Sequence, residues 1–187
     1  MLIGDIETFG LEWATMASGL PMKEIDLPCK LQEKDIQRAK KLADTPIGTG
    51  HDNFLVGITV HMTITATVKW WQQFQRYHFA DIVSSQSTMH KLPDMLKNGT
   101  FLFHEKTNHA MIDLLLKMAE DGASLEELAY SCPMGLQITA AVTTNYRQLK
   151  TIYQQRKNHR LQEWKGFCNI LADTLPCSYL FTCGSEP

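Results

Sequence analysis

The sequence predicts an α+β protein that folds as a single domain over residues 1–187. Two segments, 54–66 and 135–145, alternate apolar and polar residues with the period of a β-strand. Helical patterns lie between and after these segments in blocks, without the regular strand–helix alternation of a doubly wound parallel sheet. A chain of 187 residues has the usual length of one domain and can bury a sizeable core.

The first part of the chain contains one clear helix. Residues 1–20 mix short apolar runs with glycine and show no clear element, and residues 21–30 are expected to form a loop because of their prolines. Residues 31–44 are rich in helix-forming side chains and stop before Thr45-Pro46, so we expect a helix there. The glycine-rich segment 47–53 is then expected to form a turn.

A strand and a second helix are expected next. In the segment 54–66 the threonines and His61 alternate with apolar side chains, which should face the core. The aromatic-rich segment 69–79 is better described as a helix, with Trp70, Phe74 and Tyr77 along one stripe. The strand positions expected to face the core are Phe54, Val56, Ile58, Val60, Met62 and Ile64.

Helices dominate the second half of the chain. Residues 81–94 are polar and irregular, whereas residues 101–122 have the pattern of one long amphipathic helix that ends at Gly122. Ser124 and Glu127 form a capping-box signature for a short helix that Pro133 ends. Residues 145–158 and 160–175 then form two helices or one bent helix. In the strand between these parts, the inward positions are Leu136, Ile138, Ala140 and Val142.

Composition predicts a soluble, cytoplasmic protein and argues against several functions. Eighteen Lys and Arg residues against twenty Asp and Glu residues give a formal charge of -2, which argues against a broad nucleic-acid or anionic-membrane surface. No apolar run reaches the roughly 18–20 residues that span a bilayer, and the acidic N-terminal segment does not resemble a signal peptide. The five cysteines are an odd number without CxxC spacing, so we expect reduced thiols and no zinc site.

Three short motifs are better explained by structure than by chemistry. His104 and His109 flank Glu105, but residues five apart on a helix do not converge on one metal ion, so no metal site is expected. Cys132 has no neighbouring base that would make it a nucleophile. The segment 48–50 lacks the GK[ST] ending of a phosphate-binding loop and is expected to be a turn.

The distribution of arginine is more informative. The chain has only five arginines, and four of them follow the two clearest strands. Arginine's planar fork suits phosphates and the acceptor edges of bases, where lysine offers only a point charge. We expect Arg147 and Arg156, nine residues apart in a helix, to share approximately one face. A solvated helix with routine ion pairs explains the same pattern. The four arginines are Arg76, Arg147, Arg156 and Arg160.

The segment 143–164 resembles the flavin-dependent thymidylate synthases, the ThyX family. The family's helix reads N-x-R-S-L, then an arginine after six more residues, then A-Q-x-E. The context agrees, because EDGASLEELAYSCPMGLQITAAVTTN resembles the family's G-x-x-x-E-x-A-R-x-x-L-P segment and the strand after it. GTGHDN resembles its S-G-H-E-S turn, and WWQQFQRYHF stands where the family has Q-x-x-R-H-R. The matching helix positions are Asn145, Arg147, Leu149, Arg156 and Gln162.

The resemblance implies a fold, an assembly and a reaction. The fold is a central antiparallel sheet flanked by long helices, in a cytoplasmic homotetramer with FAD and dUMP at the subunit boundaries. Reduced flavin carries a one-carbon unit from methylenetetrahydrofolate to C5 of dUMP, and NADPH reduces the flavin. No cysteine nucleophile is required, in agreement with the interpretation of Cys132.

The resemblance also implies roles for individual residues. Arg156 matches the catalytic arginine that holds the pyrimidine edge, where a guanidinium can stabilise negative charge on the ring as C5 becomes nucleophilic. The positions that match flavin-binding residues are His51, Arg76, His78, Asn145 and Arg147. The positions that match nucleotide-binding residues are Gln73, Arg76, Gln86 and Arg156.

The chain departs from the family in its signature, RHRxxSxNExSxRY, which here reads RYHFADIVSSQSTM. Arg76 is kept, whereas Asp81 replaces a serine and Thr88-Met89 replace the closing Arg-Tyr. The arginine of the A-R-x-x-L-P segment is also absent, so two arginines expected near the dUMP phosphate are missing. Two further hypotheses therefore stand beside thymidylate synthesis. One is a flavoenzyme that modifies another pyrimidine nucleotide, for example by hydroxymethylation, and the other is a non-catalytic nucleotide-binding homologue.

Overall fold

The computed structural model describes residues 1–22, 30–99 and 102–183. Its centre is a four-stranded sheet with the strand order β1-β2-β4-β3, in which all neighbouring strands are antiparallel. The predicted α+β class and the antiparallel sheet are therefore confirmed. The strands are β1 (Leu2–Phe9), β2 (Thr59–Thr67), β3 (Asp81–Ser85) and β4 (Gln137–Asn145).

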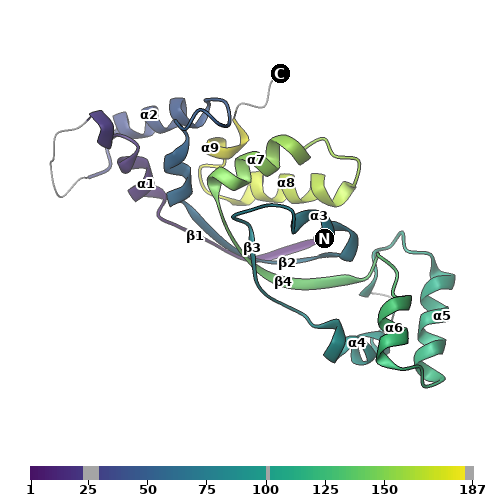
Figure 1. Ribbon diagram of the computed structural model, residues 1–187. Helices are drawn as coiled ribbons and strands as arrows, with labels where there is room; N and C mark the ends of the chain where they lie inside the picture. Colours follow the sequence, from purple (N-terminus) through teal and green to yellow (C-terminus); the bar gives the residue numbers. More distant parts are fainter. Residues whose placement is uncertain (23–29, 100–101, 184–187) are drawn as a thin grey trace.

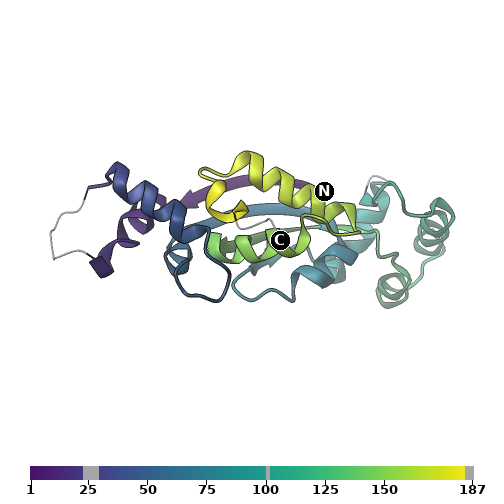
Figure 2. The ribbon, with the colours of Figure 1, turned by 90° about the horizontal axis from the view of Figure 1, so that it is seen from above.

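The helices form one layer over the sheet and two groups at its ends (Figures 1 and 2). The layer contains α3 (Val68–Phe74), α7 (Tyr146–Arg156), α8 (Gln162–Thr174) and α9 (Tyr179–Thr182). One end carries α1 (Leu11–Ala17), the short 3-10 helix η1 (Leu20–Met22) and α2 (Glu33–Ala43). The other end carries α4 (Thr88–Lys97), α5 (His109–Glu120) and α6 (Leu125–Ser131). No helix in the described part of the chain is long and apolar enough to cross a membrane.

The alternating strands place their apolar side chains against the helical layer, as the sequence predicts. In the β2–β4 register, Met62 pairs with Val142 and Ile64 pairs with Ala140, and all four side chains are buried. The expected strand begins late, because Asn53–Gly57 forms the 3-10 helix η2 and leaves Val56 exposed. Apolar alternation alone does not distinguish these two conformations over so few residues.

Aromatic rings join α3 to α8 above the sheet. The Trp70 ring lies 4.8 Å from Phe74 on its own helix, and 4.7 Å from Trp164 and 5.3 Å from Phe167 on α8. All four side chains are buried. The stripe predicted for the segment 69–79 therefore exists as far as Phe74, where α3 ends.

Two elements were not predicted at the N-terminus. Residues 1–20 contain β1, an edge strand, and α1, which begins after Gly10. Gly10 has φ +77°, and a Cβ there would collide with the Gly57 carbonyl, so the turn requires glycine. Part of the predicted loop 21–30 lies outside the described residues, while α2 confirms the helix expected at 31–44.

Residues 81–94 were wrongly predicted to be irregular, since they form β3 and most of α4. β3 is an exposed edge strand with a bulge between Ile82 and Ser84, so its sequence shows little apolar alternation. α4 continues through Pro93, whose missing amide costs one helical hydrogen bond. Leu92, Met95 and Leu96 bury one face of this helix and offset that cost.

The long helix predicted for residues 101–122 is shorter than expected. α5 begins only at His109, because the Asn108 side chain accepts a hydrogen bond from the Ala110 amide (2.9 Å) and caps it. Its end before Gly122 and the Ser124–Glu127 capping box of α6 are both confirmed. A second hydrophobic core holds α4, α5 and α6 together through Leu92, Leu96, Ile112, Leu115 and Leu128.

A buried carboxylate fixes the junction between β2 and α3. Glu163 on α8 accepts hydrogen bonds from the Thr67 amide (3.0 Å) and the Thr67 hydroxyl (2.6 Å). The same hydroxyl accepts a hydrogen bond from the Trp70 amide (3.1 Å) and caps α3. Glu163 therefore holds the start of α3 against α8.

We predict that Glu163→Ala lowers the free energy of unfolding by about 1.5–3 kcal/mol, because it removes a charged acceptor from two buried donors. Urea denaturation measures this loss. Glu126→Ala, at an exposed position of α6, is the control and should change stability by less than about 0.5 kcal/mol. Equal losses in the two variants would contradict the junction role.

Candidate functional site

Helix α7 carries predicted site residues at both ends. Asn145 is its N-cap, and its Oδ1 accepts a hydrogen bond from the Gln148 amide (2.9 Å). Arg147 lies in the first turn and Arg156 is the last helical residue. The Asn145 oxygen is thus engaged in capping, while the two arginines make contacts outside their helix.

At the start of α7, a buried ion pair anchors the turn that contains His51. The Lys150 Nζ lies 2.9 Å from Asp52 Oδ2 and donates to the Thr45 carbonyl (2.6 Å), and both charged side chains are fully buried. Arg147 Nη1 donates to Asn53 Oδ1 (2.9 Å). Arg147 Nε lies 3.3 Å from Asp52 Oδ1 without hydrogen-bond geometry, so that contact is purely between charges. The turn 51–53 therefore has a defined position on α7.

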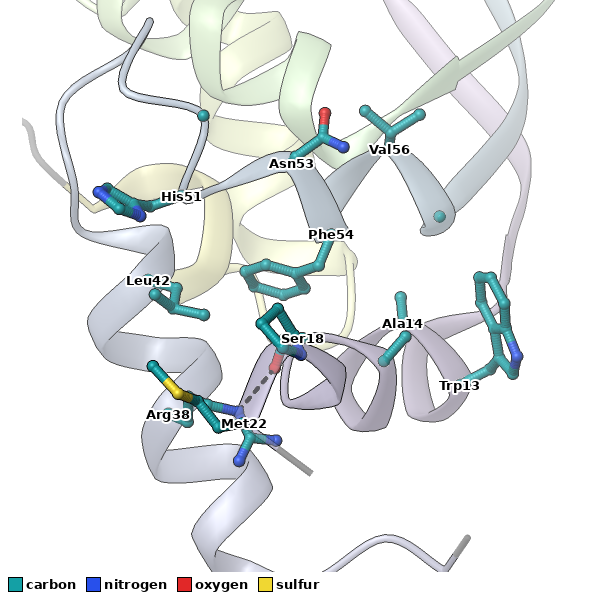
Figure 3. Close-up of a pocket in the computed structure, with 14 residues that line it drawn as sticks. Trp13, Ala14, Ser18, Met22, Arg38, Leu42, His51, Asn53, Phe54 and Val56 are labelled. Atoms are coloured by element: carbon teal, nitrogen blue, oxygen red, sulfur yellow. Dashed lines mark hydrogen bonds between the residues drawn. The ribbon is translucent and has the colours of Figure 1, made fainter. Parts of the chain in front are cut away.

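His51 lies beside a pocket of about 660 Å³ between this turn, α1 and α2 (Figure 3). Phe54 lies near its centre, with His51 and Leu42 on one side and Trp13 on the other. Arg38 donates to the Ser18 hydroxyl (3.2 Å) and forms an ion pair with the buried Asp35. The pocket is mostly apolar, and its polar side chains are those of Ser18, Arg38, His51 and Asn53. Such a lining suits a planar ring system with few polar substituents.

At the end of α7, the Arg156 guanidinium is held by aromatic and amide groups. Its Nε donates to the Tyr77 hydroxyl (2.6 Å) and its Nη1 donates to Gln73 Oε1 (3.3 Å). The guanidinium carbon lies 4.7 Å from the Trp164 ring centre, within the range of a cation–π contact. The Trp164 indole donates to the same Gln73 oxygen (2.8 Å). The orientation of Arg156 is therefore set before any ligand binds.

The expectation that Arg147 and Arg156 share one face of α7 is wrong. Nine residues advance a helix by about two and a half turns, which leaves the two side chains on opposite sides. Arg147 contacts Asn53 in the η2 segment, whereas Arg156 contacts Gln73 on α3. The structure thus brings Arg147 to the turn of His51, and Arg156 to Gln73.

The remaining predicted residues lie apart from these two groups. Arg76 is exposed just after α3, and His78 lines a second pocket of about 650 Å³ beside the loop that leads into β3. Gln86 extends the edge of the sheet beyond β3. Its backbone amide donates to the Thr139 carbonyl (2.9 Å), and its side-chain Oε1 accepts from the Thr139 backbone amide (2.9 Å). The roles assigned to these residues stay predictions.

The loop between α3 and β3 contains an unusual backbone conformation. Phe79 has φ +60°, in the left-handed region that a bulky side chain adopts rarely and at a cost of about 1–2 kcal/mol. Its carbonyl accepts a hydrogen bond from the buried Thr144 hydroxyl of β4 (2.9 Å). The Phe79 side chain is nevertheless 71% exposed. The fold therefore maintains an unfavourable backbone conformation at a residue whose aromatic ring lies mostly in solvent.

The sequence did not identify several residues beside Arg156. Trp164 and Tyr77 contact its guanidinium, and Gln155 accepts a hydrogen bond from the Tyr77 hydroxyl (2.9 Å). His159 packs edge-on to Trp164, and desolvation, followed by the positive charge of Arg156, lowers its pKa. His159 Nδ1 accepts from the Leu161 amide (3.1 Å), which places the proton of the neutral ring on Nε2. Only the position of Tyr77 inside the signature could have indicated a role.

Burial disfavours the reactive thiolate at two of the cysteines. Burial raises the pKa of Cys132 to about 11 and that of Cys168 to about 12, so both are thiols rather than thiolates at neutral pH. Cys177 and Cys183 are also free, and Cys29 lies outside the described residues. Within residues 1–22, 30–99 and 102–183, no group of three or more potential ligands is arranged to hold a metal ion.

No family model and no curated protein sequence matches the chain, but solved structures match its fold. A flavin-dependent thymidylate synthase ThyX from Helicobacter pylori, complexed with FAD and dUMP, has a TM-score of 0.79 at 16% identity over 97% of this chain and 98% of that chain. Another Helicobacter pylori ThyX structure with FAD and dUMP has a TM-score of 0.80 at 16% identity, and both chains are fully covered. The UMP/dUMP methylase PolB from Streptomyces cacaoi, bound with 5-Br dUMP, has a TM-score of 0.70 at 12% identity over 98% of this chain and 97% of that chain.

These similarities define the class of fold. The chain has the α+β fold of the flavin-dependent thymidylate synthases over its whole length. The same fold occurs in a nucleotide methylase, so it does not by itself select one reaction. The resemblance inferred from the sequence is thus confirmed for the fold.

We predict that Lys150→Met lowers the free energy of unfolding by about 3–5 kcal/mol, because it leaves the buried Asp52 carboxylate without its closest cation. Urea denaturation measures this effect. The matched control is the double variant Lys150→Met/Asp52→Asn, which removes both charges and should recover a large part of the loss. A loss below about 1 kcal/mol in the single variant would contradict the anchoring role of the pair.

Proposed function

We propose that this chain is an FAD-dependent enzyme that modifies C5 of a pyrimidine nucleotide, with dUMP as the substrate and a one-carbon unit as the group transferred. The observation that carries this proposal is the fixed guanidinium of Arg156. Trp164 and Gln73 hold the guanidinium next to Tyr77, which lines the second pocket. Its orientation therefore needs no further ordering when a ligand binds. Its Nη2 takes part in neither of the two hydrogen bonds to Tyr77 and Gln73. A carbonyl oxygen of a pyrimidine fits this donor.

The residues near His51 fit a flavin. The pocket of about 660 Å³ offers the Phe54 and Trp13 rings for stacking and the His51 and Asn53 side chains for hydrogen bonds. Arg147 keeps an exposed part of its side chain next to Asn53, where it can meet an anionic group. The buried Asp52–Lys150 pair holds these groups in position. We propose that His51, Asn145 and Arg147 bind FAD, together with Arg76 and His78.

The chemistry is divided between cofactor and protein. Reduced flavin supplies the transfer of a one-carbon unit from methylenetetrahydrofolate, with NADPH as the reductant. Arg156 stabilises negative charge on the pyrimidine ring, while Gln73 fixes Arg156 through its Oε1. Gln86 and Arg76 are the further nucleotide-binding residues of the proposal. This division needs no cysteine nucleophile, in agreement with the raised pKa values of the half-buried Cys132 and the buried Cys168.

We further propose a cytoplasmic homotetramer, as the resemblance implies. The face of the sheet opposite the core carries Thr63 and Thr65 of β2 and Thr139 and Thr143 of β4, and no described helix covers it in Figure 1. Leu2 and Phe9 of β1 lie in register with Thr65 and Thr59 on this face, and both are exposed. An uncovered sheet face with exposed apolar side chains supports assembly with further copies.

Another pyrimidine nucleotide is the second candidate substrate. The chain lacks two arginines that the family places near the dUMP phosphate, and Asp81 introduces an exposed carboxylate in the signature. PolB, which shares the fold, is a methylase of UMP as well as dUMP. The chain lacks these phosphate contacts but keeps Arg156. This combination favours a different nucleotide substrate over a loss of enzymatic activity.

Flavin binding and isotope release test the proposal. We expect the purified protein to bind FAD with the absorption bands of oxidised flavin, and to release tritium from C5-labelled dUMP when methylenetetrahydrofolate and NADPH are supplied. Protein that stays colourless after incubation with FAD would contradict the flavoenzyme and indicate a non-catalytic homologue. Bound flavin without tritium release from dUMP, but with release from labelled UMP, would support the second candidate.

We predict that Arg156→Lys keeps its FAD content but loses about 10²–10³-fold in turnover, because lysine cannot keep both the Trp164 contact and the hydrogen bond to Tyr77. Single-turnover measurements on the flavin-loaded protein follow the effect. Arg160→Lys, at an exposed position four residues later, is the control and should retain activity. Loss of FAD together with activity would instead place Arg156 in cofactor binding.

A further inference from the structure

Phe79 combines a strained backbone with an exposed ring. The chain on both sides of it is fixed, which explains how the left-handed conformation is maintained. Tyr77 is held by Gln155 and Arg156, and Ala80 is buried in the main core before β3 begins. The Phe79 carbonyl is held by the Thr144 hydroxyl. A strained residue that its surroundings maintain is characteristic of functional sites.

The pocket beside Phe79 suits a ring rather than a phosphate. Its lining contains no lysine or arginine, and it includes the exposed carboxylate of Asp81, which would repel a phosphate. Gln75, Tyr77 and His78 also line this pocket and carry hydrogen-bonding groups. The Phe79 side chain supplies an apolar surface there without being needed for the core, since most of it is exposed.

We propose that Phe79 is a specificity-determining residue whose side chain stacks on the uncharged heterocyclic ring of the ligand. The Phe79 side chain lines the same pocket as Tyr77, whose hydroxyl accepts a hydrogen bond from Arg156, so a ring stacked on Phe79 would lie near the residue that holds the guanidinium. This inference rests on the proposed function, which supplies two such rings, the pyrimidine of dUMP and the isoalloxazine of FAD.

Calorimetric titration with dUMP and with FAD, each added separately, tests the proposal and identifies the ring. We expect Phe79→Ala to weaken the binding of one of them by about 5-fold to 100-fold, as for other ring–aromatic contacts. Phe79→Tyr keeps the ring and should bind within about threefold of the unmodified protein. Tyr130→Ala removes another largely exposed aromatic side chain, on α6, and is the control that should not change binding.

Phe79→Gly separates function from stability. Glycine adopts a positive φ without steric cost, so this variant should unfold at a higher temperature than Phe79→Ala while it binds the ligand as weakly. Wild-type affinity of Phe79→Ala for both dUMP and FAD would overturn the proposal, and so would a changed oligomeric state, which would place Phe79 in a subunit contact. If the unmodified protein binds neither compound, the proposed function fails and this inference fails with it.

Discussion

The buried ion pair between Asp52 and Lys150 fixes the turn 51–53 against helix α7. It joins the turn after α2 to the helix that follows β4, two segments separated by almost a hundred residues. Two buried charges are stable only when they are paired. Here the Thr45 carbonyl also accepts a hydrogen bond from Lys150, and Asp52 Oδ1 lies 3.3 Å from the charged Arg147 Nε without a hydrogen bond. The Asp52–Lys150 contact fixes the positions of three predicted or neighbouring site residues. His51 and Asn53 flank Asp52 in the turn, and Arg147 lies three residues before Lys150 in α7.

The other end of α7 is stabilised by the core itself. Trp164 packs on Trp70 in the aromatic cluster and also carries the guanidinium of Arg156 on its ring. A site built on such a side chain is rigid, since the indole cannot move without disturbing the packing of α3 on α8. Tyr77, which replaces a histidine of the family signature, supplies the hydroxyl that accepts from Arg156. The departure from the signature is thus compatible with an ordered arginine.

Regular elements with strong periodicity were predictable, and weakly patterned edges were not. The central strands β2 and β4 and the helices α2, α7 and α8 agree with the sequence patterns, because their buried faces repeat over two or more turns or strand pairs. The edge strands β1 and β3 were missed, since each has one neighbour and a bulge that interrupts the alternation. Helix α4 was missed because Pro93 signals a break locally, whereas the packing of Leu92 and Leu96 against α5 and α6 is visible only in three dimensions.

The sequence by itself determined the α+β class, the two central strands and the small set of arginines that follow them, because these depend on local periodicity and composition. The resemblance to flavin-dependent thymidylate synthases, which the fold confirms, also came from residue spacing in the segment 143–164 and from the collinear segments before it. Only the tertiary structure decided that Arg147 and Arg156 point to different neighbours, that Trp164 and Tyr77 hold Arg156, and that Phe79 presents its ring from a strained backbone. These facts depend on contacts between residues that are far apart in the chain, and no local pattern encodes such contacts.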